Sequence, residues 1–175
     1  MKREIKRNLY RLLHPKLTFL LTSVDRKGRE NVMTLAWATP LSEEPPLLGI
    51  AVGKESLTAQ NIKETKEFVL NVPDEKLLSA VWVCGTKSGR EVDKFVKANL
   101  TKTKARFVRP PYIKECLAQI ECRVKKVIDC GECFFFVGEI QHSVAEGMAF
   151  QNFWRREAKV LLHLGGKRFW VGGNW

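Results

Sequence analysis

Apolar residues in this chain fall into short runs separated by turn-forming residues. Residues 17–24 are mostly apolar and include Thr18 and Thr22, a turn follows at 25–28, and residues 31–39 resume the extended pattern. This arrangement predicts a β-hairpin. Along the whole chain, the same pattern predicts strands at residues 17–24, 31–39, 47–52, 68–72, 117–128, 132–143 and 160–163.

Helical patterns are fewer and shorter. Ser56 or Thr58 can cap a helix whose remaining residues carry helical periodicity. A break is expected at 84–89, where glycine and polar residues gather. The predicted helices are residues 2–13, 58–65, 74–83 and 90–99.

The clearest hairpin joins residues 117–128 to 132–143. In its first strand Ile120 and Cys122 alternate with charged residues, so one face should be wet. Residues 134–137 are apolar on both faces, so the second strand should be central. Strands joined mostly by hairpins, with short helices between them, indicate an antiparallel barrel rather than a doubly wound sheet.

The whole chain, 1–175, is expected to form one domain that is mainly β with short helices. A hydrophobic content of 45% is enough for a core. No apolar run approaches the ~20 residues that cross a bilayer. The basic N-terminus carries no signal-peptide pattern. We therefore expect a cytoplasmic protein without a membrane partner.

One predicted strand carries an unusual mixture of side chains. Over residues 31–39, alternation places Asn31 and Trp37 on one face and Thr34 on the other. Neither face is simply polar or simply apolar, and Pro40 is expected to end the strand pairing. The polar groups face either water or a bound molecule.

The formal net charge is +11, and basic residues concentrate at 1–16, 87–109 and 123–126. A solvated surface, attraction of nucleic-acid phosphates and steering of small anions such as nucleotides all agree with this charge. Aromatic residues of the kind that stack on bases are missing from these segments. We do not expect a nucleic-acid partner, although charge alone does not decide.

The five cysteines are odd in number and irregularly spaced, which argues against a secreted disulfide framework. Cys130 and Cys133 flank Gly-Glu at a predicted turn. A second pair with zinc-site spacing is missing, so no metal site is expected. A turn with incidental thiols is favoured over a redox centre, and a reversible disulfide stays open.

Residues 49–58 look superficially like a phosphate loop. The spacing fails because three residues rather than four separate the glycines, and Glu55 follows Lys54. What remains is a strand end, Lys54, the hydroxyls of Ser56 and Thr58, and a helix N-terminus that favours an anion. A phosphate monoester site and an ordinary helix cap with a solvated lysine fit this pattern equally well.

A second basic loop, 86–90, leads into Asp93 and Lys94. Its N–H groups and cations can cradle a phosphate. The alternative is a surface loop with a local ion pair, and this alternative is favoured when the loop is considered alone.

The histidines form no catalytic triad. His14, His142 and His163 lie far apart in the sequence, and none is near a nucleophile motif. Alternation would place His142 on the same strand face as Phe134 and Phe136. This pattern is typical of a core histidine and equally of a histidine in a ligand cavity.

Three segments, taken in order, resemble a known family: NVMTLAWATPLSEEPPLLGIAVGKESLTAQNIKETKEFVLNVP, then SGREVDKF, then ECRVKKVI with FFFVGEIQH. They resemble the flavin reductase-like, FMN-binding split-barrel proteins, which include flavoredoxins and flavin or ferric reductases. The resemblance covers residues 12–170 and is most specific over 31–73. It implies a six-stranded antiparallel Greek-key barrel, noncovalent FMN and a homodimer with the flavin near its interface.

The resemblance also implies site residues, although residues 147–164 have no clear counterpart. The matching positions are Asn31, Met33, Thr34 and Trp37 along the isoalloxazine ring, Lys54, Ser56 and Thr58 at the phosphate end, Ser88, Gly89 and Lys94 in a second phosphate-proximal segment, and His142 and Phe169 near the ring. No catalytic residue is assigned, because flavin itself carries the electron chemistry.

The implied activity is that of an NAD(P)H-dependent flavin or ferric reductase. Hydride would pass from NAD(P)H to flavin, and electrons would move onward to free flavin, a ferric complex or a redox protein. One alternative is a flavoredoxin-type electron carrier that does not itself oxidise NAD(P)H. A basic nucleic-acid-binding protein is a more remote alternative.

Overall fold

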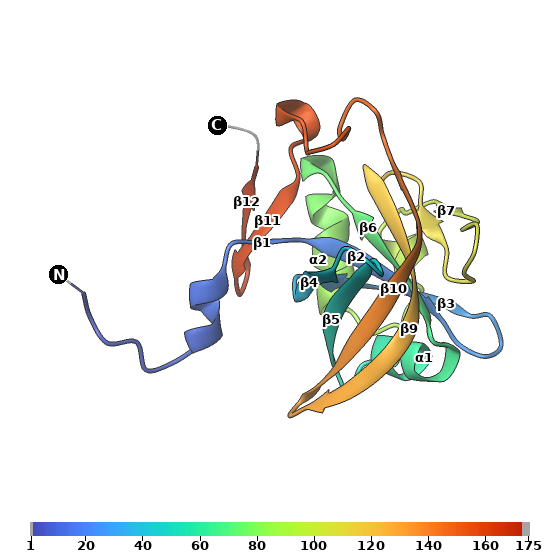
Figure 1. Ribbon diagram of the computed structural model, residues 1–175, viewed down its shortest axis with the longest axis horizontal. Helices are drawn as coiled ribbons and strands as arrows, with labels where there is room; N and C mark the ends of the chain where they lie inside the picture. Colours follow the sequence, from blue (N-terminus) through green and yellow to red (C-terminus); the bar gives the residue numbers. More distant parts are fainter. Residues whose placement is uncertain (1, 173–175) are drawn as a thin grey trace.

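The computed structural model describes residues 2–172 and is built around one antiparallel sheet of seven strands (Figure 1). The order of the strands in the sheet is β3-β2-β6-β9-β10-β5-β4. Their bounds are Phe19–Val24 for β2, Glu30–Leu35 for β3, Ala38–Ser42 for β4, Leu47–Gly53 for β5, Glu67–Val72 for β6, Ala118–Cys130 for β9 and Cys133–Ala145 for β10. The sheet curls but stays open between β3 and β4, as in a split barrel. The predicted fold class, mainly β with short helices, is confirmed.

Two small sheets and a few short helices complete the fold. The small sheets contain β1 (Lys16–Leu17), β11 (Leu161–Gly165) and β12 (Arg168–Val171), and β7 (Lys102–Thr103) with β8 (Tyr112–Ile113). The helices are α1 (Leu57–Thr65), α2 (Leu78–Thr86) and α3 (Lys94–Lys97), with 3₁₀ turns η1 (Leu9–Leu13), η2 (Glu75–Leu77) and η3 (Arg156–Ala158). Within residues 2–172, every helix is too short or too polar to span a bilayer.

The single strand predicted over 31–39 is wrong. β3 ends at Leu35 and pairs with β2, whereas β4 begins at Ala38 and pairs with β5 at the opposite edge of the sheet. This division gives seven strands in place of the expected six. Pro40 lies inside β4 and does not end the pairing, because the outward side of an edge strand needs no N–H donor.

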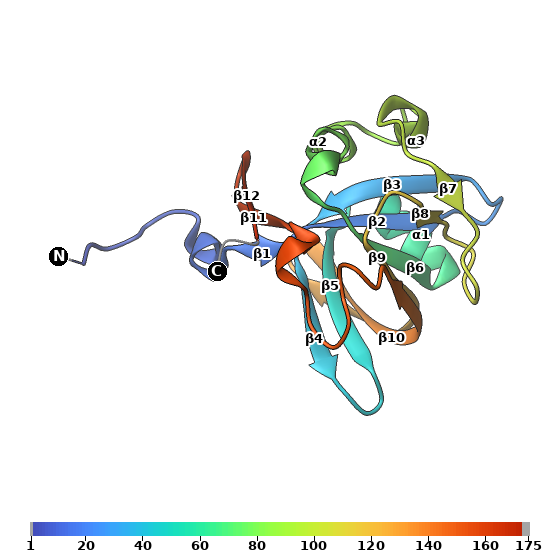
Figure 2. The ribbon, with the colours of Figure 1, turned by 90° about the horizontal axis from the view of Figure 1, so that it is seen from above.

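Helix boundaries also differ from the prediction. Of residues 2–13, only Leu9–Leu13 form a 3₁₀ turn, which stands away from the seven-stranded sheet in Figure 2. None of its side chains is buried. Without a packed apolar face, a short basic helix has little to stabilise it. α2 continues to Thr86, into the break that was expected at 84–89, and only Lys94–Lys97 of residues 90–99 are helical.

Two apolar clusters fix the position of β3. Inside the barrel, Leu35 packs with Phe68, Phe136 and residues of α1. On the other face, Val32 packs with residues of α2 and α3, which cover β2 and β3 in Figure 2. The predicted alternation of side chains along β3 therefore holds as far as Leu35, and β3 presents one face to the barrel interior and one to α2.

Glu121 of β9 is a fully buried carboxylate that holds the loop before β8. It accepts hydrogen bonds from the backbone N–H groups of Arg106 at 2.9 Å, Phe107 at 2.6 Å and Val108 at 3.1 Å, and from the hydroxyl of Tyr112. Burial alone would raise the pKa of Glu121, but these hydrogen bonds hold it below its ordinary value of 4.5.

We predict that Glu121→Gln lowers the free energy of unfolding by about 2–3 kcal/mol at pH 7, because a charged acceptor of buried N–H groups is lost. The stabilisation from Glu121 is fully present above the ordinary pKa of 4.5 and disappears as pH falls through the lowered folded-state pKa. Urea unfolding at pH 7 and pH 3 measures both effects. Glu91→Gln, at an exposed carboxylate, is the control. An equal loss for Glu121→Gln at both pH values would contradict the assignment.

Candidate functional site

Two cavities adjoin one another between β3 and α2. The polar cavity, of about 360 Å³, lies between β3, the start of α1, the loop after α2 and α3. The aromatic cavity, of about 570 Å³, lies between β3, α2, β5 and the β11–β12 hairpin. Thr34 and Gly85 line both cavities. The two spaces therefore offer one elongated ligand a polar end and an aromatic end.

The polar cavity gathers most of the residues that the sequence predicted for an FMN site. These residues come from β3, α1, the basic loop and α3, which are separated by up to about 60 positions in the chain. The predicted residues that line the polar cavity are Asn31, Met33, Thr34, Ser56, Thr58, Ser88, Gly89 and Lys94.

The start of α1 forms one wall of the polar cavity. The hydroxyl of Ser56 caps the helix by accepting the N–H of Ala59 at 3.0 Å. The buried Thr58 hydroxyl accepts the side-chain amide of Asn31 at 2.8 Å. A first helical turn presents N–H groups and a positive dipole end, which favour an anion. Ser56 is therefore a helix cap that stands at the wall of a polar cavity, and its role at a phosphate stays a prediction.

Lys94 is the most informative residue of the polar cavity. Its side chain is only 5% exposed, and its Nζ donates to the carbonyl of Cys84 at 3.2 Å. Among the described residues, no carboxylate forms an ion pair with it. Burial lowers the pKa of Lys94. A buried cation without an anionic partner is costly, so the position favours a bound anion.

Two further features suit the polar cavity to an anion. Lys87 and Arg90 add positive charge to its rim, and Arg90 is held by a hydrogen bond of 3.0 Å to the carbonyl of Glu55. A Cβ at Gly89 would fall 2.1 Å from Oδ1 of Asn31. Only glycine therefore leaves both the asparagine and the cavity in place.

The aromatic cavity has large rings on its walls and two unpartnered polar atoms at its lining. Trp37, Trp82 and Phe169 supply the rings. Oγ1 of Thr18 and Nδ1 of His163 are buried and have no hydrogen-bond partner within residues 2–172. Nε2 of His163 lies 3.0 Å from the backbone carbonyl of Gly166, which only accepts, so Nε2 is the donor in this contact. This cavity suits a planar ring with a polar edge.

The structure does not bring Lys54 to the polar cavity. Its Nζ forms an ion pair with Asp129 at 2.6 Å and lies 5.2 Å from the centre of the Phe134 ring. Its backbone N–H donates to the carbonyl of Glu132 at 3.0 Å. Lys54 thus joins the end of β5 to the β9–β10 turn, on a different side of the strand end from Ser56.

His142 lies on the opposite face of β10 from the one that alternation predicted. The pairing with β9 is irregular between Ile140 and His142, so that Ile140 opposes Cys122 and His142 opposes Glu121. This bulge inserts one residue and reverses the alternation. The centres of the His142 and Phe107 rings are 5.6 Å apart. His142 lines neither the polar nor the aromatic cavity.

Several lining residues were missed from the sequence. Trp82 and Gly85 belong to α2, which was expected to end before Gly85. Lys87 and Arg90 stand in the basic loop that was noted, but only its serine and glycine were selected. No sequence signal could have selected His163, because it reaches the cavity only through the pairing of β11 with β1 beside β2.

Known proteins match this chain over nearly its whole length. The family model of the flavin reductase like domain matches residues 10–169. A protein of Archaeoglobus fulgidus is 45% identical over 145 residues, which cover 83% of this chain and 80% of that protein. Flavoredoxin from Methanosarcina acetivorans is 29% identical with a TM-score of 0.86 and covers 100% of this chain and 93% of its own.

A further solved structure supports the fold assignment alone. The FMN-binding protein from Thermus thermophilus with bound 1-cyclohex-2-enone has a TM-score of 0.85 at 20% identity, over 99% of this chain and 95% of that chain. Since the family model covers far more than half of the sequence, this chain belongs to the flavin reductase-like domain family.

Proposed function

We propose that this chain is an FMN-binding oxidoreductase. The observation that carries the proposal is the buried Lys94, without an ion pair among residues 2–172, in a polar cavity that adjoins a second cavity lined by aromatic rings. FMN has the same division, with a phosphate at one end and a planar ring with a polar edge at the other. The unpartnered atoms of Thr18 and His163 fit such an edge. The Thermus protein of similar fold is an FMN-binding protein by its own description.

In this proposal the two cavities bind different parts of FMN. Lys94, Arg90 and the first turn of α1 would hold the phosphate. The passage between the cavities, where Gly85 has no side chain, would take the ribityl chain. Trp37 and Trp82 would flank the ring. When bound, FMN supplies hydride and electron transfer, and the protein supplies orientation and electrostatics.

The preferred activity is NAD(P)H-dependent reduction of flavin or of a ferric complex. Trp37 and Trp82 are 37% and 39% exposed at the rim of the aromatic cavity, so a flavin ring held beside them would be open to a nicotinamide from solvent. The net charge of +11 would attract both FMN and the dinucleotide. The second candidate is an electron carrier that passes electrons to a redox protein, and the similarity to a flavoredoxin favours it.

The first experiment measures FMN binding by equilibrium dialysis at low salt and then NAD(P)H oxidation with and without added free flavin or ferric chelate. We expect binding in the micromolar range or tighter and steady-state oxidation that depends on the added acceptor. Binding without oxidation would select the electron carrier. An absence of FMN binding would reject the proposal itself.

We also propose that the protein works as a homodimer. Leu12 and Leu13 of η1 are both 72% exposed. In the same turn, the centre of the Tyr10 ring lies 5.4 Å from the centre of the Trp37 ring. An exposed apolar surface beside the aromatic cavity suits contact with a second copy. Light scattering should give twice the mass of the chain, and Leu12→Glu with Leu13→Glu should give the mass of one chain. A wild-type mass of one chain at micromolar concentration would reject the dimer.

A further inference from the structure

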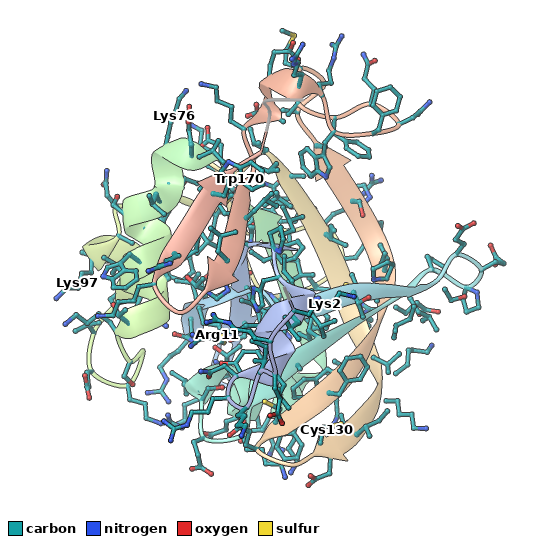
Figure 3. All side chains as sticks on the ribbon, turned by 90° about the vertical axis from the view of Figure 1, so that its left-hand side faces the viewer. Lys2, Arg11, Lys76, Lys97, Cys130 and Trp170 are labelled. Atoms are coloured by element: carbon teal, nitrogen blue, oxygen red, sulfur yellow. The ribbon has the colours of Figure 1, made fainter. Side chains whose placement is uncertain are left out.

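Two of the five cysteines oppose one another across the turn of the longest hairpin. Cys130 ends β9 and Cys133 begins β10, and they are direct partners in the strand register. Gly131, with φ of 64°, and Glu132 form the turn between them. Figure 3 shows Cys130 near the free end of this hairpin. Opposed residues of an antiparallel pair lie about 4.5–5.5 Å apart at Cα and point to one face. That spacing suits a disulfide.

The two thiols have different surroundings. Cys130 is exposed to solvent, whereas Cys133 is half-buried and lines the aromatic cavity. Burial raises the pKa of Cys133. The other three cysteines, Cys84, Cys116 and Cys122, are buried elsewhere in the core. Among the described residues, only this pair places one thiol at the wall of the aromatic cavity and a second thiol beside it in the solvent.

The hairpin end is held against the cavity by contacts with β5. Cys133 is paired with Gly53, which also lines the aromatic cavity. The next residue, Lys54, is held by two contacts with the β9–β10 turn. Its backbone N–H donates to the carbonyl of Glu132, and its Nζ forms the ion pair with Asp129. These contacts explain why Lys54 is turned away from the phosphate end, and they keep Cys133 at the cavity wall.

We propose that Cys130 and Cys133 form a reversible disulfide that carries electrons from reduced flavin in the aromatic cavity to an anionic small-molecule disulfide in solution. The inference rests on the proposed binding of FMN. It adds disulfide reduction to the activity of the chain. An anionic substrate suits the net charge of +11.

The proposed cycle balances in three steps. The Cys130–Cys133 disulfide takes two electrons and two protons from the reduced flavin, its S–S bond breaks, and two thiols and oxidised flavin result. The Cys130 thiolate then attacks the substrate disulfide, releases one substrate thiol and forms a mixed disulfide. Cys133 attacks the sulfur of Cys130, releases the second substrate thiol and restores the internal disulfide. The net reaction converts reduced flavin and one disulfide into oxidised flavin and two thiols.

The flavin half of the cycle is tested by thiol trapping. FMN binding is first established by dialysis, and the protein is oxidised with diamide. It is then mixed anaerobically with photoreduced FMN, alkylated with N-ethylmaleimide and analysed by peptide mass spectrometry. We expect a Cys130–Cys133 disulfide before reduction and two alkylated thiols afterwards. Failure to form this disulfide, or its persistence with reduced FMN bound, would overturn the inference alone. Absence of FMN binding at the first step would overturn the proposed function as well.

The substrate half is tested with 5,5′-dithiobis(2-nitrobenzoate) as the probe and with two matched variants. Reduced wild-type protein should release two thionitrobenzoate ions for each pair and end with the internal disulfide. Cys133→Ser should release one and retain one as a mixed disulfide on Cys130. Cys130→Ser should react at least about tenfold more slowly, since only the half-buried thiol remains. It should bind FMN as wild type does. Equal reactivity of the two variants would overturn the assigned order.

Discussion

Replacing Lys94 by methionine is expected to weaken FMN binding and to stabilise the FMN-free fold at the same time. A charge-assisted hydrogen bond to phosphate contributes about 1.5–3 kcal/mol, so the dissociation constant should rise about 10- to 100-fold. In the free protein Lys94 is a buried cation without an ion pair, and methionine fills the same space without a desolvation cost. Fluorescence titration of FMN measures the first effect, and urea unfolding without FMN measures the second.

The control for this prediction is Lys97→Met. Lys97 lies on α3, one turn after Lys94, but it is exposed and outside the polar cavity. The control variant should change the dissociation constant less than about twofold through general charge alone. Equal weakening by both substitutions would mean that Lys94 acts through net charge and not by contact with the phosphate.

Because of Lys94, we also predict that the affinity for FMN depends on pH. Burial lowers the pKa of Lys94, and phosphate binding requires its charged form. FMN affinity should therefore fall as pH rises through this lowered pKa, within a range where exposed lysines stay charged. Bound phosphate shifts the pKa of Lys94 back upward, which delays the loss. Titrations of wild type and Lys94→Met across pH 7 to 10 test this expectation, and a slope that persists in Lys94→Met would contradict it.

The polar cavity was largely predictable because its residues act through local chemistry. Ser56 begins α1 as a helix cap, and Asp93 begins α3 in the same way, accepting the N–H of Phe95 at 2.9 Å. Such caps can be recognised from residue type and spacing. Once both helices are placed, their first turns and Lys94 fall beside β3. The family resemblance supplied the remaining step, which was that these segments meet.

The aromatic cavity and the orientation of His142 were not predictable, because each depends on nonlocal pairing. One extra residue in β10 turns His142 to the opposite face, and alternation along a single strand contains no sign of it. β3 and β4 likewise separate because they pair with β2 and β5 at opposite edges. Trp37 lies at this division and reaches the aromatic cavity from the connection and not from a strand, and its implied place along the isoalloxazine ring stays a prediction.

The adjacency of the two cavities leads to the second large prediction, which is that Gly85→Leu abolishes measurable FMN binding while the fold is retained. Gly85 lines both cavities, and a Cβ there already lies 3.2 Å from Cβ of Thr34. A leucine side chain would fill the passage through which one ligand must extend. α2 itself should tolerate the change, because leucine is the better helix former by nearly 1 kcal/mol. The affinity should fall on the order of 100-fold or more.

Two further variants decide what this loss means. Gly147→Leu is the matched control, since a Cβ at Gly147 meets no atom within 4 Å and the residue lies outside both cavities. Gly85→Ala should reduce affinity less than leucine does, because a methyl group requires only a small shift of Thr34. Isothermal calorimetry with FMN and with riboflavin measures the binding, and thermal unfolding monitors the fold. If Gly85→Leu binds FMN as wild type does, a single ligand does not span the two cavities. The polar cavity and the aromatic cavity then cannot hold the phosphate and the ring of the same FMN molecule.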